Sequence, residues 1–501
     1  MIGFRHGVSG LVVAAMLSLI AACTGDLGDE APFDALARSD GPDVSPDDAS
    51  FAADAEPGAE AVCTRTVAVS TSAQLSSAIG NALAGDCIVL ENGTYTFPAI
   101  KKKGTAQAPI VISARHRGAA RVASGSLVLE GAAFVTVEGI LWNSAGNVRV
   151  SSSSNCRISR FTFRPGVAEV DNSDWLTVSG TSKSTRIDHN DFGQRTRIGN
   201  MIMLAGKGAQ IVQGTRIDHN YIHDIHRGGG NGWEAIRAGL SGLALSSANT
   251  VIEFNLFERA DGDPETISLK SSDNVVRFNT MRNTNGEFTL RHGNRDQIYG
   301  NFILSGSSGI RVCGEDHQIF NNYIQDVTGT AIFLESGDSD VRNEAGKAHY
   351  RVWNAKVVFN TIVNSGTGIA NGGGHTFHPV STVVANNIVV GRSGSLYKER
   401  TPVTPTYQGN IGNPTGGTAI GMTVGASQVR RVDPRLAAVN GVSRLTVGSP
   451  AINAAVGSFP FVTRDIDGDA RESPDVGADE LVTGGTLARP LVPADVGPDS
   501  P

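Results

Sequence analysis

One short motif, a strand-like run built around an asparagine, recurs eight times along the middle of the chain. In order it reads RIDHNDF, RIDHNYI, VIEFNLF, VVRFNTM, QIYGNFI, QIFNNYI, KVVFNTI and VVANNIV. Its asparagines are Asn190, Asn220, Asn255, Asn279, Asn301, Asn322, Asn360 and Asn387. The closest of them, Asn301 and Asn322, are separated by an interval of 21 (322 minus 301). A repeat of about 20 to 50 residues indicates a solenoid, a propeller or an array of small units.

The three shortest intervals, which join Asn255 through Asn322, fit one coil of a right-handed parallel β-helix, and the longer ones fit coils with insertions. Strands of successive coils would stack about 4.8 Å apart, with the asparagines turned inward at one corner and bonded to turn backbone. A propeller would need about 40 or more residues per blade, and a leucine-rich repeat would need a leucine ladder that is absent. We therefore predict an all-β, right-handed parallel β-helix.

Ahead of the repeat, the sequence predicts one short helix. Thr71 to Gln74 resembles a capping box. Apolar residues then recur at helical spacing until Gly85 ends the helix: Leu75, Ala78, Ile79 and Leu83. An amphipathic helix here would cap the open end of the stacked coils.

The N-terminus indicates export. Residues 1–22 form a signal peptide, and Ile20 to Cys23 resembles a bacterial lipobox, in which Cys23 is lipidated. Residues 23–62 are interpreted as an acidic disordered linker. We expect an exported protein, either a lipoprotein of the bacterial outer membrane or cell surface or an extracellular protein, that meets the membrane only through this lipid anchor.

The linker also hides the charge of the folded part. It holds eleven Asp or Glu against one Arg, or −10, so the net charge of −7 leaves about +3 for the remainder (−7 minus −10). A mildly basic domain is compatible with an anionic substrate. We expect an anionic partner other than nucleic acid, and oligomeric state stays open.

Beyond the linker, we divide the chain into three parts. Residues 63–390 are predicted as the catalytic β-helix, 391–483 as its C-terminal end with closing segments, and 484–501 as a disordered tail. Cys63 and Cys87 could pair, whereas Cys156 and Cys313 are expected to be buried singly. No CxxC motif or Cys/His cluster in the sequence indicates zinc. In the closing segment, Asp465, Asp467 and Asp469 are interpreted as turn residues rather than calcium ligands.

The residues best suited to chemistry lie between positions 263 and 293. Asp263 and Glu265 alternate along one strand, so one face would present both carboxylates to a hard cation such as Ca²⁺. The interval between Lys270 and Arg291 is 21 (291 minus 270), the length of the shortest coil, which predicts neighbouring rungs. Strict alternation would put Lys270 on the face opposite Glu265, so this assignment requires a bend around residues 268 and 269.

Four segments, in order, resemble polysaccharide lyase family 6, the alginate lyases and chondroitinase B. They are RGGGNGWEAIRAG, ETISLKS, TLRHGN and SSGIRVCGEDH. The resemblance implies that Asn231, Asp263 and Glu265 bind Ca²⁺, that Lys270 is the catalytic base and that Arg291 is the acid. The family usually has Glu where this chain has Asp263, which puts the strength of metal binding in doubt.

The resemblance also implies the reaction. Lys270, in neutral form, would remove the proton alpha to a uronate carboxylate, and β-elimination would leave an unsaturated sugar. Arg237, His292 and Arg311 are expected to bind substrate, and Glu234 and Glu315 either line the groove or are structural. Alginate is the leading substrate and dermatan or chondroitin sulfate the second. A pectinase-like hydrolase with paired acids and a non-catalytic polysaccharide-binding protein are the other classes.

Overall fold

The computed structural model describes residues 63–226, 231–340, 348–391 and 393–501. The predicted signal peptide, Cys23 and the acidic linker lie outside these ranges. Among the described residues, no helix is long and apolar enough to cross a membrane.

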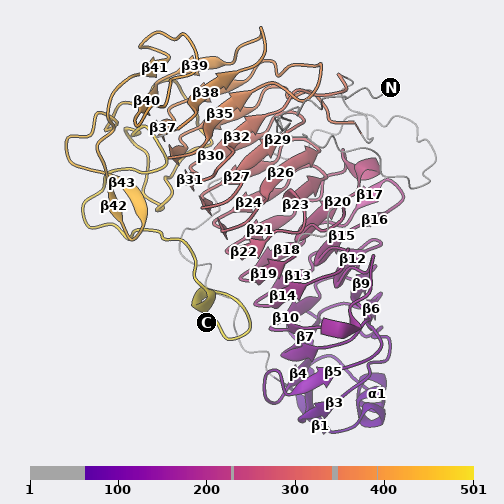
Figure 1. The fold of residues 1–501 in the computed structure, drawn as a ribbon. Helices are drawn as coiled ribbons and strands as arrows, with labels where there is room; N and C mark the ends of the chain where they lie inside the picture. The colour runs from indigo at the N-terminus through magenta and orange to yellow at the C-terminus, as the bar shows by residue number, and fades with distance from the viewer. Residues whose placement is uncertain (1–62, 227–230, 341–347, 392) are drawn as a thin grey trace, which may run out of the picture. The chain divides into compact units, whose positions relative to one another are not determined.

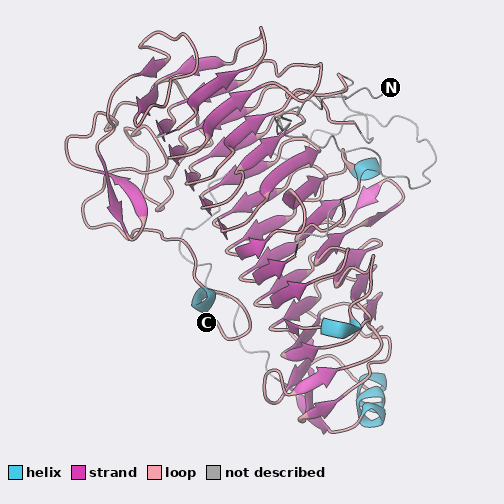
Figure 2. Ribbon diagram, in the orientation of Figure 1, coloured by secondary structure: helices cyan, strands magenta, loops and turns pink. Residues whose placement is uncertain are grey.

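The described chain winds through three parallel sheets, with strands of each sheet stacked coil upon coil (Figures 1 and 2). Sheet A contains β1 (Arg65–Val69), β2 (Asp86–Leu90), β4 (Ile110–Ala114), β7 (Val135–Glu138), β10 (Arg157–Ser159), β13 (Arg186–Asp188), β18 (Arg216–Asp218), β21 (Val251–Glu253), β24 (Val275–Arg277), β27 (Gln297–Tyr299), β30 (Gln318–Phe320), β33 (Lys356–Val358), β36 (Val383–Ala385) and β39 (Thr406–Gln408). Sheet B contains β3 (Gly93–Thr94), β5 (Ala120–Val122), β8 (Ile140–Trp142), β11 (Thr162–Phe163), β14 (Asp191–Arg195), β19 (Tyr221–Ile225), β22 (Leu256–Ala260), β25 (Thr280–Arg282), β28 (Phe302–Leu304), β31 (Tyr323–Gln325), β34 (Thr361–Val363), β37 (Ile388–Gly391), β40 (Asn410–Pro414) and β41 (Val429–Arg430).

Sheet C contains β6 (Leu127–Glu130), β9 (Val148–Ser151), β12 (Leu176–Ser179), β15 (Ile202–Leu204), β20 (Ile236–Gly239), β23 (Glu265–Lys270), β26 (Glu287–His292), β29 (Ile310–Val312), β32 (Thr330–Leu334), β35 (Thr367–Asn371) and β38 (Ser395–Glu399). Two antiparallel hairpins stand apart from the coils: β16 (Gly206–Lys207) with β17 (Gln210–Ile211), and β42 (Leu436–Val439) with β43 (Val442–Leu445). The predicted parallel β-helix is confirmed.

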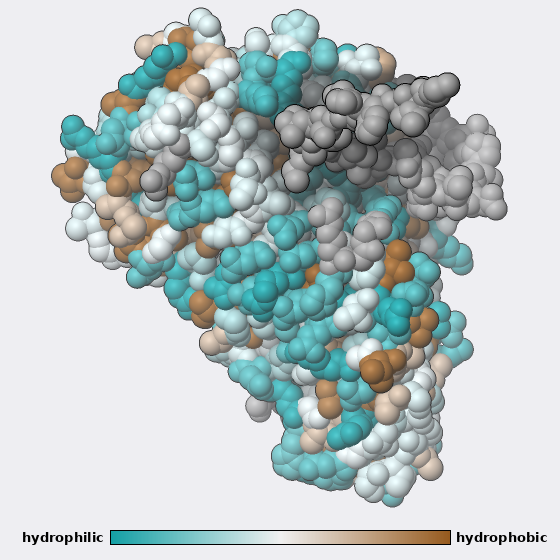
Figure 3. All heavy atoms as spheres, in the orientation of Figure 1, coloured by the Kyte–Doolittle hydropathy of each residue, from teal (hydrophilic) through white to brown (hydrophobic). Residues whose placement is uncertain are grey.

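Apolar side chains of the three sheets fill the space between them. Ile252, Val276 and Ile298 follow one another on sheet A, and each is fully buried. Burying one such side chain contributes about 1.5–3 kcal/mol. Outward residues are mainly polar, and the surface over the middle coils around β21, β22 and β24 is hydrophilic (Figure 3).

The asparagine ladder is confirmed at the corner between sheets A and B. Asn279 is fully buried, and its Nδ2 donates to the carbonyls of Ile252 (2.8 Å) and Arg277 (2.9 Å) and to Oδ1 of Asn301 (3.1 Å). The residue before it, Phe278, takes φ 54°, the left-handed backbone that turns the chain sharply from one sheet into the next. The amide side chain at this corner therefore satisfies backbone groups that the turn directs inward.

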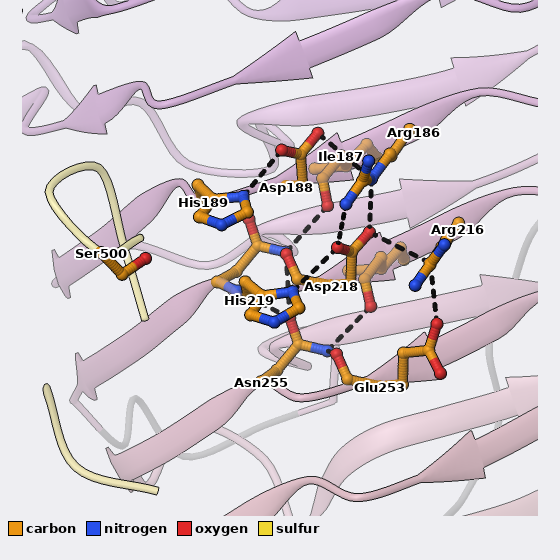
Figure 4. A network of polar contacts seen from close by, with 12 residues as sticks. Arg186, Ile187, Asp188, His189, Arg216, Asp218, His219, Glu253, Asn255 and Ser500 are labelled. Atoms are coloured by element: carbon orange, nitrogen blue, oxygen red, sulfur yellow. Dashed lines mark hydrogen bonds and ion pairs between the residues drawn. The ribbon is translucent and has the colours of Figure 1, made fainter. Parts of the chain in front are cut away.

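A second ladder of charged side chains runs beside the asparagines (Figure 4). The ring Nδ1 of His189 lies 2.8 Å from Asp188, and that of His219 lies 2.9 Å from Asp218. Arg186 donates to Asp218 at 2.7 Å, and the two imidazoles stack 4.8 Å apart. These contacts give both histidines a structural role.

The N-terminal cap is shorter than the sequence indicated. Helix α1 (Ser72–Gly80) has Thr71 as its N-cap, and Thr71 accepts from the backbone N–H of Gln74 as a capping box requires. The helix ends at Gly80 rather than at Gly85, and Leu83 is 68% exposed. Short 3₁₀ turns, η2 (Gly166–Ala168), η3 (Ser241–Leu243) and η4 (Pro493–Asp495), complete the helical elements of the described chain.

The cysteines of the described chain agree with the sequence prediction. Cys63 and Cys87 form a disulfide, which ties the start of the domain to β2. Cys156 and Cys313 are buried free thiols. One covalent link therefore closes the N-terminal end of the coils.

The C-terminal segment folds back along the outside of the coils. Val442, Ile466 and Ala478 pack against Phe302 and Tyr323 of sheet B, which buries a small apolar cluster of its own. This contact closes the segment against the sheet rather than over the end of the stack. The part of the chain after residue 430 is therefore a strap along the β-helix.

The aspartates of this strap shape its turns. One oxygen of Asp465 accepts from the backbone N–H groups of Asp467 (2.9 Å) and Asp469 (2.7 Å). Arg444 donates to Asp467 at 2.7 Å and to Asp479 at 2.9 Å. An arginine thus already supplies the positive charge that these carboxylates require.

The prediction of a disordered tail at 484–501 is wrong. Arg160 donates to the carbonyls of Pro498 (2.7 Å) and Ser500 (2.8 Å), and the Gly497 N–H donates to the His219 carbonyl at 2.8 Å. The glycine and proline content suggested disorder, but these backbone groups find their partners on coils from the first half of the chain. Composition carries no signal for such a contact.

Candidate active site

The predicted site residues gather on the outer face of sheet C. The register of β20, β23, β26 and β29 places Arg237, Ser268, Thr289 and Arg311 in one row across four neighbouring strands. The residues beside this row, such as Leu269, point into the core. The outer side of sheet C at this position is therefore a row of polar residues, fully buried at Ser268 and Thr289 and with an arginine at each end. We call this row and the residues around it the groove.

A β-bulge at the start of β23 turns the first acidic residues onto this face. Glu265 pairs with Glu287, and the next pairing joins Ile267 to Phe288, so Thr266 is an extra residue without a partner. An extra residue reverses the alternation of side chains. Glu265 consequently lies on the outer face of sheet C, the same face as Arg237 and the rest of its row.

A second irregularity lies at the other end of the same strand pair. Leu269 pairs with Leu290 but Lys270 pairs with His292, which leaves Arg291 as the extra residue. Lys270 and Arg291 lie on neighbouring strands, as the coil length predicted, but they are not direct partners. The bend was predicted at the wrong position. The bulge at Thr266, earlier in β23, is what puts Lys270 and Glu265 on the same face.

Lys270 is buried against a carboxylate. Its side chain is 5% exposed, and Nζ lies 3.8 Å from Oε1 of Glu234, whose side chain is fully buried. Burial lowers the pKa of Lys270, against the opposing charge of Glu234. Burial also raises the pKa of Glu234 to about 7, and neither of its carboxylate oxygens has a hydrogen-bond partner among the described residues. Because the effect of burial outweighs that of Glu234, Lys270 loses its proton more readily than a surface lysine does.

The acidic residues assigned to calcium lie beside this pair. Asp263 accepts from the backbone N–H groups of Gly232 (3.2 Å) and Glu265 (3.0 Å), which brings the chain next to Asn231 against it. Burial raises the pKa of Asp263, and the charge of Glu265 adds to that rise. Asn231 itself is exposed. The loop before β20 therefore meets the turn before β23 through its backbone at Gly232, the residue after Asn231.

Two arginines hold Glu265 in its ionised form. Arg291 Nε lies 3.1 Å from Glu265 Oε1, and Arg311 Nη2 contacts the same oxygen. Burial alone would raise the pKa of Glu265, but Arg311, Arg291 and Lys270 together lower it. Arg291 Nη1 is buried and has no hydrogen-bond partner in the described chain, so one donor remains for a bound ligand.

Arg311 connects further acids that the sequence did not single out. Its Nε lies 2.9 Å from Glu287, and its Nη1 lies 3.7 Å from Glu335. Burial raises the pKa of Glu287 to about 7. Glu287 stands one coil after Glu265 and is its direct partner on the next strand. The coil period was therefore a signal that could have found this residue.

The far end of the groove contains aromatic and sulfur-bearing side chains. The buried ring of His292 lies 6.1 Å from the rings of both His349 and Tyr350. Cys313 lies one coil after Arg291, directly after β29. Glu335 lies two coils after Arg291, directly after β32. Sequence analysis did not predict this cluster.

Other candidates lie away from the groove. The backbone of Glu315 forms isolated β-bridges with Asn294 and Trp353 at the turn between sheets C and A. The Asn294 side chain also donates to the Glu315 carboxylate at 3.3 Å. His223 lies between Asp191 (2.9 Å) and Asp224 (2.7 Å) on sheet B. Both are structural.

Three residues expected to bind substrate lie on the strands of the site. Arg237 and Arg311 stand at the two ends of the row on sheet C. His292 is the strand partner of Lys270 and is 1% exposed. The two arginines therefore have the better access to a bound polymer.

The fold and the site define a class of protein. A buried lysine with a lowered pKa, arginines and a set of carboxylates on the outer face of a β-helix suit removal of a weakly acidic proton from an extended anionic chain. The row crosses four neighbouring strands of one sheet, an extended arrangement that suits a polymer. This class is the β-helix polysaccharide lyases.

A family model described as chondroitinase B matches residues 69–396, and the chain belongs to this family. It is accordingly a polysaccharide lyase of the family 6 type. No curated protein matches the chain.

Solved structures agree with this assignment. A mannuronic acid specific polysaccharide family 6 lyase from human gut microbiota is 25% identical, with TM-score 0.60, over 73% of this chain and 93% of that one. The family 6 alginate lyase AlyGC is 23% identical, with TM-score 0.65, over 85% of this chain and 59% of that one. The family 6 polysaccharide lyase Pedsa3628 from Pseudopedobacter saltans is 20% identical, with TM-score 0.59, over 86% and 99%. The last two show the shared fold.

Proposed function

We propose that the protein is a calcium-dependent lyase that cleaves alginate by β-elimination, with Lys270 as the base and Arg291 assisting departure of the leaving oxygen. The observation that carries this proposal is the burial of Lys270 beside Glu234. The same groove contains Arg291, whose Nη1 has no hydrogen-bond partner in the described chain and can donate to a ligand. A lysine in this setting can be neutral near the operating pH, which general-base catalysis requires.

The side chains present fit a calcium ion. Asn231 would offer its amide oxygen, and Asp263 and Glu265 would offer carboxylate oxygens, the ligand type that Ca²⁺ takes. The carboxylate of Glu234, buried and without hydrogen bonds, adds negative charge near them. Asp263 supplies the same chemistry as the family's glutamate, on a side chain shorter by one methylene group. When bound, the ion would neutralise a uronate carboxylate and stabilise the negative charge that develops on it.

The chain's own residues account for the other steps. Lys270 would accept the proton at C5 of the uronate through its neutral Nζ. Arg291 would stabilise charge on the departing C4 oxygen through Nη1. A water molecule or a tyrosine would deliver the proton, because a guanidinium is a poor acid; Tyr350, whose ring lies 6.1 Å from that of His292, is the candidate tyrosine. Arg237 and Arg311, at the two ends of the same row, would bind carboxylates of flanking sugars.

Alginate is favoured over other uronate polymers on two grounds. One solved relative is described as specific for mannuronic acid, and another as an alginate lyase bound to a trisaccharide. The matching family model is described as chondroitinase B, which makes dermatan or chondroitin sulfate the second candidate.

One assay tests the proposal. The protein is incubated with alginate, dermatan sulfate and pectate in the presence of Ca²⁺, and ultraviolet absorbance of the unsaturated product is followed. We expect absorbance with alginate that is lost with a chelator and in Lys270→Met. The matched control is Lys398→Met, because Lys398 lies in the same row of sheet C but is exposed on a later strand. New reducing ends without absorbance would indicate a hydrolase, and absence of cleavage would indicate a binding protein.

We further propose that the protein is exported and lipid-anchored through Cys23. The lipobox-like residues at positions 20–23 support this proposal. The test is incorporation of labelled palmitate and membrane fractionation of the full chain and of Cys23→Ala. Equal labelling of the two proteins would contradict it.

A further inference from the structure

We propose that Cys313, Glu335 and His349 form a binding site for Zn²⁺ at the end of the lyase groove, and that the bound ion inhibits the lyase. The inhibition rests on the proposed function, whereas the binding does not. This site is separate from the oxygen ligands assigned to calcium. It would make the enzyme responsive to a second, softer metal.

The three side chains converge on one point. Cys313 Sγ lies 3.2 Å from Glu335 Oε2, and His349 Nδ1 lies 3.4 Å from the same oxygen. All three potential ligand atoms lie within 4.8 Å of one another. The residues come from the ends of β29 and β32 and from a later loop, so the fold holds the cluster together and not one local turn.

The donor set selects the metal. A thiolate, an imidazole nitrogen and a carboxylate oxygen are the ligands of Zn²⁺, and three protein ligands leave one position open. Ca²⁺ and Mg²⁺ take oxygen ligands and would bind poorly to a sulfur and a nitrogen. The ring of His375 lies 5.1 Å from that of His349, so a second imidazole is close to the cluster.

One atom of the cluster points to a missing ligand. His349 is 6% exposed, and its buried Nδ1 lies 3.4 Å from Glu335 Oε2 but forms no hydrogen bond with any described residue. A buried polar atom that loses its contact with water and gains no partner destabilises the fold. A metal ion at this point would satisfy the nitrogen directly.

Two other clusters of potential ligands in the described part of the chain lack this property. At His189, Asp218 and His219, each imidazole Nδ1 already contacts an aspartate, and Arg186 neutralises Asp218. At Asp465, Asp467 and Asp479, Arg444 supplies the positive charge. Of these three clusters, the one at Cys313 has the unsatisfied ligand atom.

Binding would act on the lyase through Glu335. Glu335 lies 3.7 Å from Arg311 Nη1, and Arg311 in turn contacts Glu265, an assigned calcium ligand. Zn²⁺ would withdraw the Glu335 carboxylate from Arg311, and the ion together with the Cys313 thiolate would add one net positive charge near Arg291 and Arg311. The Cys313 proton leaves to the buffer when the sulfur binds the metal, so binding releases a proton.

The experiment measures binding first, on the full folded protein with Ca²⁺ in millimolar excess and a non-thiol reductant. Co²⁺ serves as the spectroscopic probe, because a thiolate ligand gives a near-ultraviolet charge-transfer band, and Zn²⁺ is measured by equilibrium dialysis. We expect one Zn²⁺ per chain and a thiolate band. Cys313→Ser should abolish the band, and Cys313→Ser and His349→Ala should each weaken Zn²⁺ binding by at least about tenfold.

The matched control is Cys156→Ser, because Cys156 is the other buried free thiol of the described chain. It should keep both the band and the affinity. With Zn²⁺ added at several times its Kd, alginate cleavage should fall at least about fivefold in the wild type and in Cys156→Ser but not in Cys313→Ser. A band that persists in Cys313→Ser, absence of stoichiometric Zn²⁺ binding, or equal inhibition of all three proteins would overturn the proposal. If the protein binds Zn²⁺ as expected but cleaves no polymer, the proposed function fails while the metal site stands.

Discussion

Replacing Glu234 by glutamine should shift the pH dependence of the lyase toward acid. The Glu234 carboxylate lies 3.8 Å from Lys270 Nζ and favours the protonated lysine. Two unit charges about 4 Å apart interact by about 4 kcal/mol at an effective dielectric constant of about 20. Because one pKa unit corresponds to about 1.36 kcal/mol, the pKa of Lys270 would fall by up to about three units.

The shift will be smaller than this limit where Glu234 is only partly ionised, since its own pKa is about 7. In the proposed mechanism activity rises with pH as Lys270 becomes neutral, so a lower pKa of Lys270 should move the acid limb of kcat/KM to lower pH. The assay is initial-rate cleavage of alginate between about pH 4.5 and pH 9 at saturating Ca²⁺, and the acid limb reports the free enzyme.

Glu287→Gln is the matched control for this experiment. Glu287 is a buried carboxylate of the same groove with a pKa of about 7, but it contacts Arg311 instead of Lys270. Its variant should leave the position of the acid limb unchanged, whatever its rate. An acid limb that stays in place in Glu234→Gln, moves to higher pH, or moves equally in both variants would refute the role given to Glu234.

Two further predictions concern stability. Asn279→Ala removes the amide that satisfies the carbonyls of Ile252 and Arg277. It should therefore lower the free energy of unfolding by about 3 kcal/mol or more, measured by chemical denaturation. The control Asn285→Ala, at an exposed position of the same coil, should have little effect. The pKa of Glu287 is raised from 4.5 to about 7. Its contribution to stability is therefore full below about pH 4.5 and is lost as the pH rises through about 7. Without Ca²⁺, the Tm of Glu287→Gln minus that of the wild type should rise across this range, and a constant difference would contradict the raised pKa.

The extent to which sequence predicted the site follows from its construction. Lys270 and Arg291 were placed on neighbouring rungs because one coil separates them, and that spacing is visible in the chain. The face on which each side chain lies was not visible, because it depends on bulges at Thr266 and Arg291 that pairing between strands creates. A residue inserted without a partner leaves no mark on composition or periodicity.

The same reasoning explains the residues that sequence analysis passed over. Glu287 and Glu335 stand at coil spacing from residues that were chosen, but many residues share that spacing, and only burial and contact with Arg311 distinguish these two. His349 belongs to a loop of irregular length, so no period could bring it to Cys313. Clusters of this kind arise from the stacking of coils and not from any local pattern.

By itself, the sequence determined the architecture. A buried asparagine satisfies inward-facing backbone groups at one corner of successive coils. Asparagines therefore recur once per coil, and this recurrence is visible in the sequence from Asn190 to Asn387. Tertiary structure alone decided the chemistry of the groove, including the parity of Glu265, the burial of Lys270 beside Glu234 and the docking of the C-terminal strap. These features depend on contacts between coils, whose energies come from burial and charge proximity that one-dimensional spacing does not express.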